Sequence, residues 1–230
     1  MTKALKPTIV LLHGWDQDKK VWTGVQNRLA RNYSTLALDL PGFGKEIKPH
    51  TDWGIPEYSE WLENSLQKEN LQNVILIGHS FGGRIAAYIA HKNPQWLQAL
   101  ILSGAPCIYS PNIFIKIKGL LAKYLGRILP ENIKRWFLGK ENLKAREKGM
   151  KNIRYKAITF DQTLFISKIQ VPSLIINGEK DSAHPVKLAK RTKTIIPNSI
   201  LIILKNLGHN TFIENEDLFY KEVIHFIEKL

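Results

Sequence analysis

Short apolar runs alternate with amphipathic stretches along most of the chain. Residues 8–12 form an uninterrupted run of β-branched and aliphatic side chains, which is typical of a strand buried on both faces. Similar runs predict five further strands, over residues 35–38, 74–77, 99–102, 173–176 and 200–204. The stretches between them predict helices near residues 21–31, 57–69, 82–92, 186–195 and 215–229. We therefore expect an α/β fold with a mainly parallel sheet of about six strands and helices on both faces.

One long segment departs from this alternation. Residues 106–165 contain helical patterns and no clear strand, and they lie between the fourth and fifth predicted strands. We predict an α/β core formed by residues 1–105 and 166–230, with residues 106–165 as an inserted helical cap. Within the cap, residues 113–128 carry apolar side chains at three- and four-residue steps. This stripe either packs the cap onto the sheet or lines an acyl pocket.

The composition is that of an ordinary globular domain. The chain has 230 residues, of which 44% are hydrophobic and 23% are charged. No apolar stretch reaches the roughly 18 residues that a membrane span needs, so we expect no integral membrane segment. The N-terminal residues do not resemble a signal peptide, and the lone cysteine, Cys107, fits a reducing compartment. These features predict a cytoplasmic location.

The positive charge of the chain is concentrated in the predicted cap. The formal net charge is +13, and residues 106–165 contain thirteen Lys or Arg residues against four acids. This cluster has three interpretations: a solvated surface, a docking surface for an acidic carrier protein, or a surface for anionic lipid. We expect no nucleic-acid partner, because no nucleic-acid recognition motif accompanies the charge.

Residues 78–82 read Gly-His-Ser-Phe-Gly and lie between a predicted strand and a predicted helix. A serine on a sharp strand-to-helix turn is strained, and its neighbours two residues away must lack side chains to avoid collision. The turn exposes the serine hydroxyl at the carboxyl end of the sheet. This context identifies Ser80 as a candidate nucleophile, whereas the alternative is a glycine-rich turn with an inert serine.

A serine nucleophile needs a base and a group that orients the base. In this architecture, the acid and then the histidine follow later strands. Asp181 comes just after the fifth predicted strand, and His209 comes just after the sixth. We predict that Asp181 orients His209 against Ser80. Glu179 is the alternative acid, and Asp181 could instead cap the helix that begins near Pro185.

Two backbone amides are candidates for the oxyanion hole. The first predicted strand ends in His-Gly-Trp, and acyl transfer commonly uses one amide from such a loop and one from the residue after the nucleophile. This predicts that the amides of Trp15 and Phe81 bind the oxyanion. We expect His13 to brace its loop by hydrogen bonds and His79 to pack beside the elbow. His184 follows no strand and is the weaker alternative base.

The order and spacing of these motifs resemble those of the α/β-hydrolase fold family over essentially the whole chain. The matching segments are His13-Gly14-Trp15, Asp39-Leu40-Pro41-Gly42-Phe43-Gly44, Gly78-His79-Ser80-Phe81-Gly82-Gly83, Gly178-Glu179-Lys180-Asp181 and Gly208-His209. The first two segments resemble bacterial carboxylesterases such as the acyl-carrier-protein methyl ester esterase of biotin synthesis. Residues 80–84 resemble the menaquinone-pathway synthase that eliminates pyruvate. The biotin enzyme typically has Trp where this chain has His79.

The resemblance implies a serine hydrolase that cleaves a carboxylic ester of a small or acyl-chain substrate through an acyl-enzyme. No metal and no organic cofactor are implied. One alternative is a lyase or C–C bond hydrolase that acts on an anionic substrate with the same serine, histidine and aspartate. Arg84 and the basic cap could favour such a substrate, although we expect Arg84 to be a helix-surface residue. A second alternative is a non-catalytic ligand-binding module.

Overall fold

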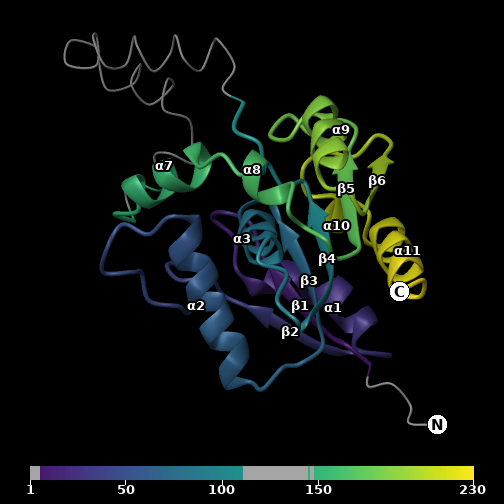
Figure 1. The fold of residues 1–230 in the computed structure, drawn as a ribbon, viewed down its shortest axis with the longest axis horizontal. Helices are drawn as coiled ribbons and strands as arrows, with labels where there is room; N and C mark the ends of the chain where they lie inside the picture. The colour runs from purple at the N-terminus through teal and green to yellow at the C-terminus, as the bar shows by residue number, and fades with distance from the viewer. Residues whose placement is uncertain (1–5, 111–144, 146–147) are drawn as a thin grey trace.

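The computed structural model describes residues 6–110, 145 and 148–230 (Figure 1). Its centre is a sheet of six parallel strands in the order β2-β1-β3-β4-β5-β6. The predicted strands and the mainly parallel sheet are therefore confirmed. The strand bounds are β1 Thr8–Leu12, β2 Ser34–Leu38, β3 Val74–His79, β4 Leu97–Ser103, β5 Ser173–Gly178 and β6 Ser199–Leu204.

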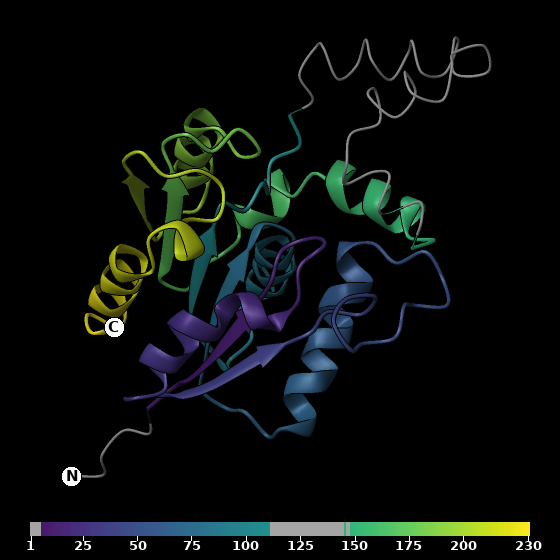
Figure 2. The same cartoon turned by 180° about the vertical axis from the view of Figure 1, so that it is seen from behind.

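Helices cover both faces of the sheet, as Figures 1 and 2 show from opposite sides. Side chains of α1 (Thr23–Leu29) and α11 (Glu216–Ile227) pack into one apolar cluster. Side chains of α2 (Ile55–Lys68) and α3 (Ser80–Ala90) pack into a second cluster. Because successive strand residues face opposite sides, β1 sends Ile9 and Leu11 into the first cluster and Val10 and Leu12 into the second.

The remaining described helices are short or lie near the edges of the sheet. A 3₁₀ turn, η1 (Lys19–Trp22), precedes α1, so the helical segment predicted near residues 21–31 begins slightly earlier. Helix α9 (Val186–Ile195) connects β5 to β6, and α10 (Thr211–Glu214) precedes α11. None of the described helices combines the length and the hydropathy that crossing a membrane requires.

Between β4 and β5 the described residues form two helices, α7 (Lys151–Thr159) and α8 (Thr163–Ile166). Both lie toward the carboxyl ends of the strands (Figure 1). Helix α7 buries Ile153 and Ala157 among the residues of the second apolar cluster. The apolar stripe predicted over residues 113–128 lies outside the described residues, so its role and the cap boundaries stay predictions.

All six strands point the same way, so their carboxyl ends share one edge of the sheet. In open α/β sheets, ligands bind in the crevice outside this edge. The loops that follow β1, β3, β5 and β6 carry the candidate residues, and the fold therefore brings segments that are far apart in sequence to one place.

Candidate active site

Ser80 is the first residue of α3 and has a positive φ of 47°, a conformation that costs non-glycine residues about 1–3 kcal/mol. The flanking glycines make this turn sterically feasible. A Cβ atom on Gly78 would lie 2.5 Å from the Cα of Gly83, and one on Gly82 would lie 2.6 Å from the carbonyl oxygen of His13. These contacts are with backbone atoms, which cannot easily move aside. The spacing of the motif is therefore a packing requirement of the strained turn at Ser80.

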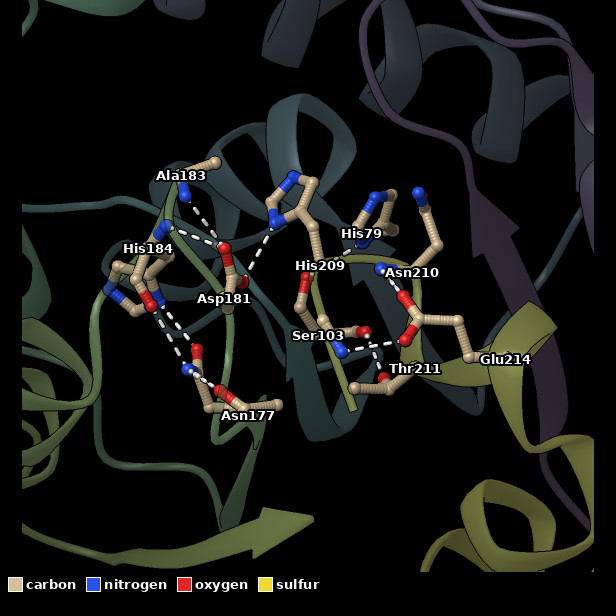
Figure 3. A network of polar contacts seen from close by, with 12 residues as sticks. His79, Ser103, Asn177, Asp181, Ala183, His184, His209, Asn210, Thr211 and Glu214 are labelled. Atoms are coloured by element: carbon tan, nitrogen blue, oxygen red, sulfur yellow. Dashed lines mark hydrogen bonds and ion pairs between the residues drawn. The ribbon is translucent and has the colours of Figure 1, made fainter. Parts of the chain in front are cut away.

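Asp181 and His209 are joined by a hydrogen bond (Figure 3). The Nδ1 atom of His209 lies 2.7 Å from Oδ2 of Asp181, and the Asp181 carboxyl is almost fully buried. Its other oxygen, Oδ1, accepts the backbone N–H groups of Ala183 and His184 at 2.9 and 2.8 Å. Because an ionised carboxylate only accepts, Nδ1 of His209 carries the proton and Nε2 is left as an acceptor.

Burial alone would raise the pKa of Asp181. The hydrogen bonds from His209 and from the His184 N–H outweigh burial, and the net pKa lies below the ordinary aspartate value. Asp181 is therefore ionised at neutral pH. Its charge favours the tautomer of His209 that holds the proton on Nδ1.

Ser80 and His209 line one cavity of about 640 Å³. Among the described residues, the His209 ring bonds to Asp181 and makes no hydrogen bond to the Ser80 hydroxyl. Catalytic hydrogen bonds are often long before substrate binds and tighten in the enzyme–substrate complex. Most of the surrounding wall is apolar or aromatic and includes Trp15, Phe81, Pro106, Ile108, Tyr109, Ile158 and Leu188.

Trp15 and Phe81 lie on the same side of this cavity. Their rings pack edge to face with centroids 5.2 Å apart. Phe81 is the second residue of α3, so its backbone N–H has no acceptor within the helix and lies at the positive end of the helix dipole. The N–H of Gly82 donates to the carbonyl of His13 at 3.1 Å and ties the elbow to the loop after β1.

A profile of the alpha/beta hydrolase fold matches residues 7–150, which is more than half of the chain. The chain belongs to the α/β-hydrolase fold family. The family and fold predicted from the sequence motifs are thus confirmed.

This α/β-hydrolase is similar to proteins described as esterases. It is 27% identical to the pimeloyl-[acyl-carrier protein] methyl ester esterase of Hamiltonella defensa, over 97% of the chain and 94% of the relative. It is 25% identical to the enzyme of the same name from Aeromonas salmonicida, over 96% of the chain and 95% of the relative. The esterase structure from Exiguobacterium antarcticum has the same fold, with a TM-score of 0.79, 23% identity and coverage of 97% and 92%.

The structure does not support the two alternatives for the acidic residues, in which Glu179 orients His209 or Asp181 caps helix α9. Glu179 accepts the backbone N–H of Asn206 at 3.0 Å and so links the loops after β5 and β6. The N-cap position of α9 is occupied by Pro185 and not by Asp181. The structure therefore brings Asp181, and not Glu179, to the imidazole of His209.

Two other histidines have structural partners. The Nε2 atom of His13 accepts the N–H of Leu40 at 2.9 Å, and Nδ1 lies 2.7 Å from the carbonyl oxygen of Gly14. This confirms that His13 braces its loop. The Nδ1 atom of His184 lies 2.8 Å from Oδ1 of Asn177, and burial lowers the pKa of His184 to about 4. Neither ring lines the cavity.

His79 packs beside the elbow, as predicted. Its ring is buried, with its centroid 4.6 Å from that of His209 and 4.9 Å from that of Phe212. Burial, and then the neighbouring His209, lower the pKa of His79 to about 3. His79 is therefore neutral at physiological pH.

The prediction that Arg84 is a helix-surface residue is wrong. Arg84 is only 4% exposed, and its two terminal nitrogens donate to the carbonyl oxygens of Pro106 and Phe160. The guanidinium is enclosed between helix α3 and the two ends of the predicted cap, which contain Pro106 and Phe160. The sequence holds a signal of this burial, because residues 85–90 are apolar around the whole helix. The expectation of a surface position therefore overlooks the role of Arg84, which joins helix α3, behind Ser80, to the ends of the cap.

Cys107 is fully buried, and burial raises the pKa of its thiol to about 12. The thiol is thus protonated at neutral pH and is a poor nucleophile. Across the described residues, no group of three or more His, Cys, Asp or Glu side chains is arranged to hold a metal ion.

Proposed function

We propose that this α/β-hydrolase cleaves carboxylic esters through an acyl-enzyme formed on Ser80. His209 acts as the base, Asp181 orients it, and the amides of Trp15 and Phe81 bind the oxyanion. The observation that carries this proposal is the 2.7 Å hydrogen bond between Asp181 and His209. It leaves Nε2 as the only acceptor on the His209 ring, in a cavity that Ser80 also lines.

The reaction follows from these roles in two stages. The Oγ atom of Ser80 attacks the ester carbonyl carbon while Nε2 of His209 takes its proton. The alcohol then leaves with that proton, and the acyl group stays on Ser80. In the second stage His209 takes a proton from water, which attacks the acyl-enzyme, and the carboxylic acid is released as Ser80 regains its proton.

The cavity and the relatives support an acyl ester as the substrate. An apolar wall suits an alkyl chain, because it removes apolar surface from water. The relatives from Hamiltonella defensa and Aeromonas salmonicida are both described as methyl ester esterases.

The lyase or C–C hydrolase alternative has less support. That interpretation used Arg84 and the basic cap as attractive groups for an anionic substrate. Arg84 lines the cavity, but two backbone carbonyls engage its terminal nitrogens, so these are poorly placed to bind a substrate carboxylate.

A panel of p-nitrophenyl esters of increasing acyl length, run beside diketone and carboxylated substrates, tests the proposal. We expect ester turnover that Ser80→Ala abolishes, with a preference among acyl lengths set by the cavity. Turnover of the diketone, with the esters left intact, would support the C–C hydrolase instead.

An acidic acyl-carrier protein is a candidate partner in this proposal. It is supported by the names of the two relatives and by the charge of residues 106–165. Nine of the thirteen basic residues in that segment lie outside the described residues. Two of the others contact the core, because Lys148 pairs with Asp16 at 2.8 Å and Lys156 donates to the Asp52 carbonyl.

Salt dependence tests the carrier protein separately. We expect added salt to slow hydrolysis of a carrier-protein ester and to leave a small ester unaffected. Equal salt responses for the two substrates would contradict docking through this charge. A cytoplasmic location stays a prediction from the sequence.

A further inference from the structure

A pair of amide side chains joins two distant loops at the edge of the cavity. Oε1 of Gln17 accepts the backbone N–H of Gly14 at 2.9 Å, and Nε2 of Gln17 donates to Oδ1 of Asn210 at 3.0 Å. Gly14 directly precedes Trp15, and Asn210 directly follows His209. The pair therefore connects the neighbours of the proposed oxyanion donor and the proposed base.

His79 lies beside this connection. The carbonyl oxygen of Ser103 can only accept, so Nδ1 of His79, 3.0 Å away, carries the proton. Figure 3 shows the side chains of His79 and Asn210 next to each other.

The two hydrogen bonds of Gln17 form a relay with a fixed direction. The backbone N–H of Gly14 can only donate, so Oε1 of Gln17 accepts it and Nε2 of Gln17 donates to Asn210. Turning the Gln17 amide by 180° would place donor against donor at Gly14 and acceptor against acceptor at Asn210.

The relay is also packed tightly. A Cβ atom on Gly14 would lie 2.8 Å from Cδ2 of His79, so the loop after β1 rests directly on the His79 ring. The His79 ring also lies against the ring of His209, with the two ring centroids 4.6 Å apart. Gln17 and Asn210 both line the cavity.

We propose that Gln17 and Asn210 are positioning residues for the ester hydrolysis proposed above. Their hydrogen bonds hold the loop of Trp15 and the loop of His209 at a fixed separation around Ser80. The inference rests on the proposed function and extends it to two residues that do no chemistry themselves. A donor that acts on the transition state must be placed accurately, because its stabilisation falls quickly with misplacement.

Two nearly isosteric substitutions test the relay. Gln17→Glu can still accept from Gly14 but can no longer donate to Asn210. We expect it to lower kcat about tenfold with KM within about twofold, because the oxyanion amide and the base act in the transition state. Gln26→Glu is the matched control. Gln26 lies on α1, away from the cavity, is also half-buried, and donates to the Thr35 hydroxyl at 3.4 Å. The control should keep wild-type kcat.

Asn210→Leu gives a readout that does not depend on turnover. The leucine side chain can no longer accept the hydrogen bond from Nε2 of Gln17. We expect Asn210→Leu and Gln17→Met to be coupled, so that the double variant loses less free energy of unfolding in urea than the sum of the two single losses. Side chains that do not interact would give additive losses.

The two measurements separate this inference from the proposed function. If Gln17→Glu keeps wild-type kcat, or loses no more than Gln26→Glu does, the positioning role is wrong. Additive losses of stability in the Gln17→Met, Asn210→Leu comparison would equally overturn the relay. Absence of ester hydrolysis by the wild-type protein would count against the proposed function, while the stability comparison would still decide whether the relay exists.

Discussion

Replacing Asp181 by Asn tests the acid–base pair with the smallest change of shape. The amide oxygen of the new side chain can keep both N–H contacts that Oδ1 of Asp181 makes with Ala183 and His184. The amide nitrogen then takes the place of Oδ2, 2.7 Å from Nδ1 of His209. Because both groups are donors, His209 must move its proton to Nε2 or turn its ring. Nε2 then cannot accept the proton of Ser80.

The size of the effect follows from this loss of the productive tautomer. The same substitution in serine protease triads lowers kcat about 10⁴-fold, which corresponds to about 5 kcal/mol of transition-state stabilisation. We expect a loss of about 10³- to 10⁴-fold in kcat for Asp181→Asn. Since two of the three hydrogen bonds can persist, the free energy of unfolding should fall by no more than about 2 kcal/mol.

Steady-state hydrolysis of a short p-nitrophenyl ester measures this loss, with urea unfolding as the stability control. Glu179→Gln is the matched variant, since Glu179 is two residues away and bonds to Asn206 and not to His209. It should retain kcat within about threefold. A loss below tenfold in Asp181→Asn, or a larger loss in Glu179→Gln, would refute the assignment of the acid.

Three further substitutions have defined outcomes. Gly82→Ala places a Cβ atom 2.6 Å from the carbonyl oxygens of Leu12 and His13, so the elbow must shift and kcat for ester hydrolysis should fall at least about 100-fold. Arg84→Met leaves the Pro106 and Phe160 carbonyls without their donor and should lower the urea-derived free energy of unfolding by about 2–4 kcal/mol. His184→Gln should flatten the loss of stability between pH 6.5 and 4, because the unfolded chain takes up a proton near the ordinary value of 6.5 and folded His184 only near 4. In that range the wild-type free energy of unfolding falls by about 1.4 kcal/mol per pH unit for this group. Wild-type values in all three variants would contradict the contacts described.

The sheet could be predicted because its strands are short, apolar and buried on both faces. Val74–His79 is buried along its whole length, so its continuous apolar pattern is unambiguous. The start of the first helix was less accurate, since Lys19–Trp22 forms a 3₁₀ turn before α1. Helix ends depend on local hydrogen bonds, such as that between Asp18 and the N–H of Lys20, which the apolar pattern does not reveal.

The candidate site was predictable where its chemistry depends on local spacing. Gly78 and Gly82 mark the turn at Ser80, because each would place a Cβ atom against backbone. Contacts between distant segments could not be predicted in the same way. The bond between Gln17 and Asn210 spans 193 residues, and Arg84 is buried by segments that begin more than 20 residues later. The apolar residues 85–90 signal that Arg84 is buried, but nothing in the sequence identifies the partners in either contact.

Covalent labelling of the nucleophile is the most direct test of the proposed mechanism. A fluorophosphonate probe reacts with a serine that a base has activated, and mass spectrometry of the digested protein locates the adduct. The mechanism predicts one adduct, on the peptide that contains Ser80, and none in Ser80→Ala. A folded wild-type protein that stays unlabelled, or that is labelled equally in Ser80→Ala, would contradict it.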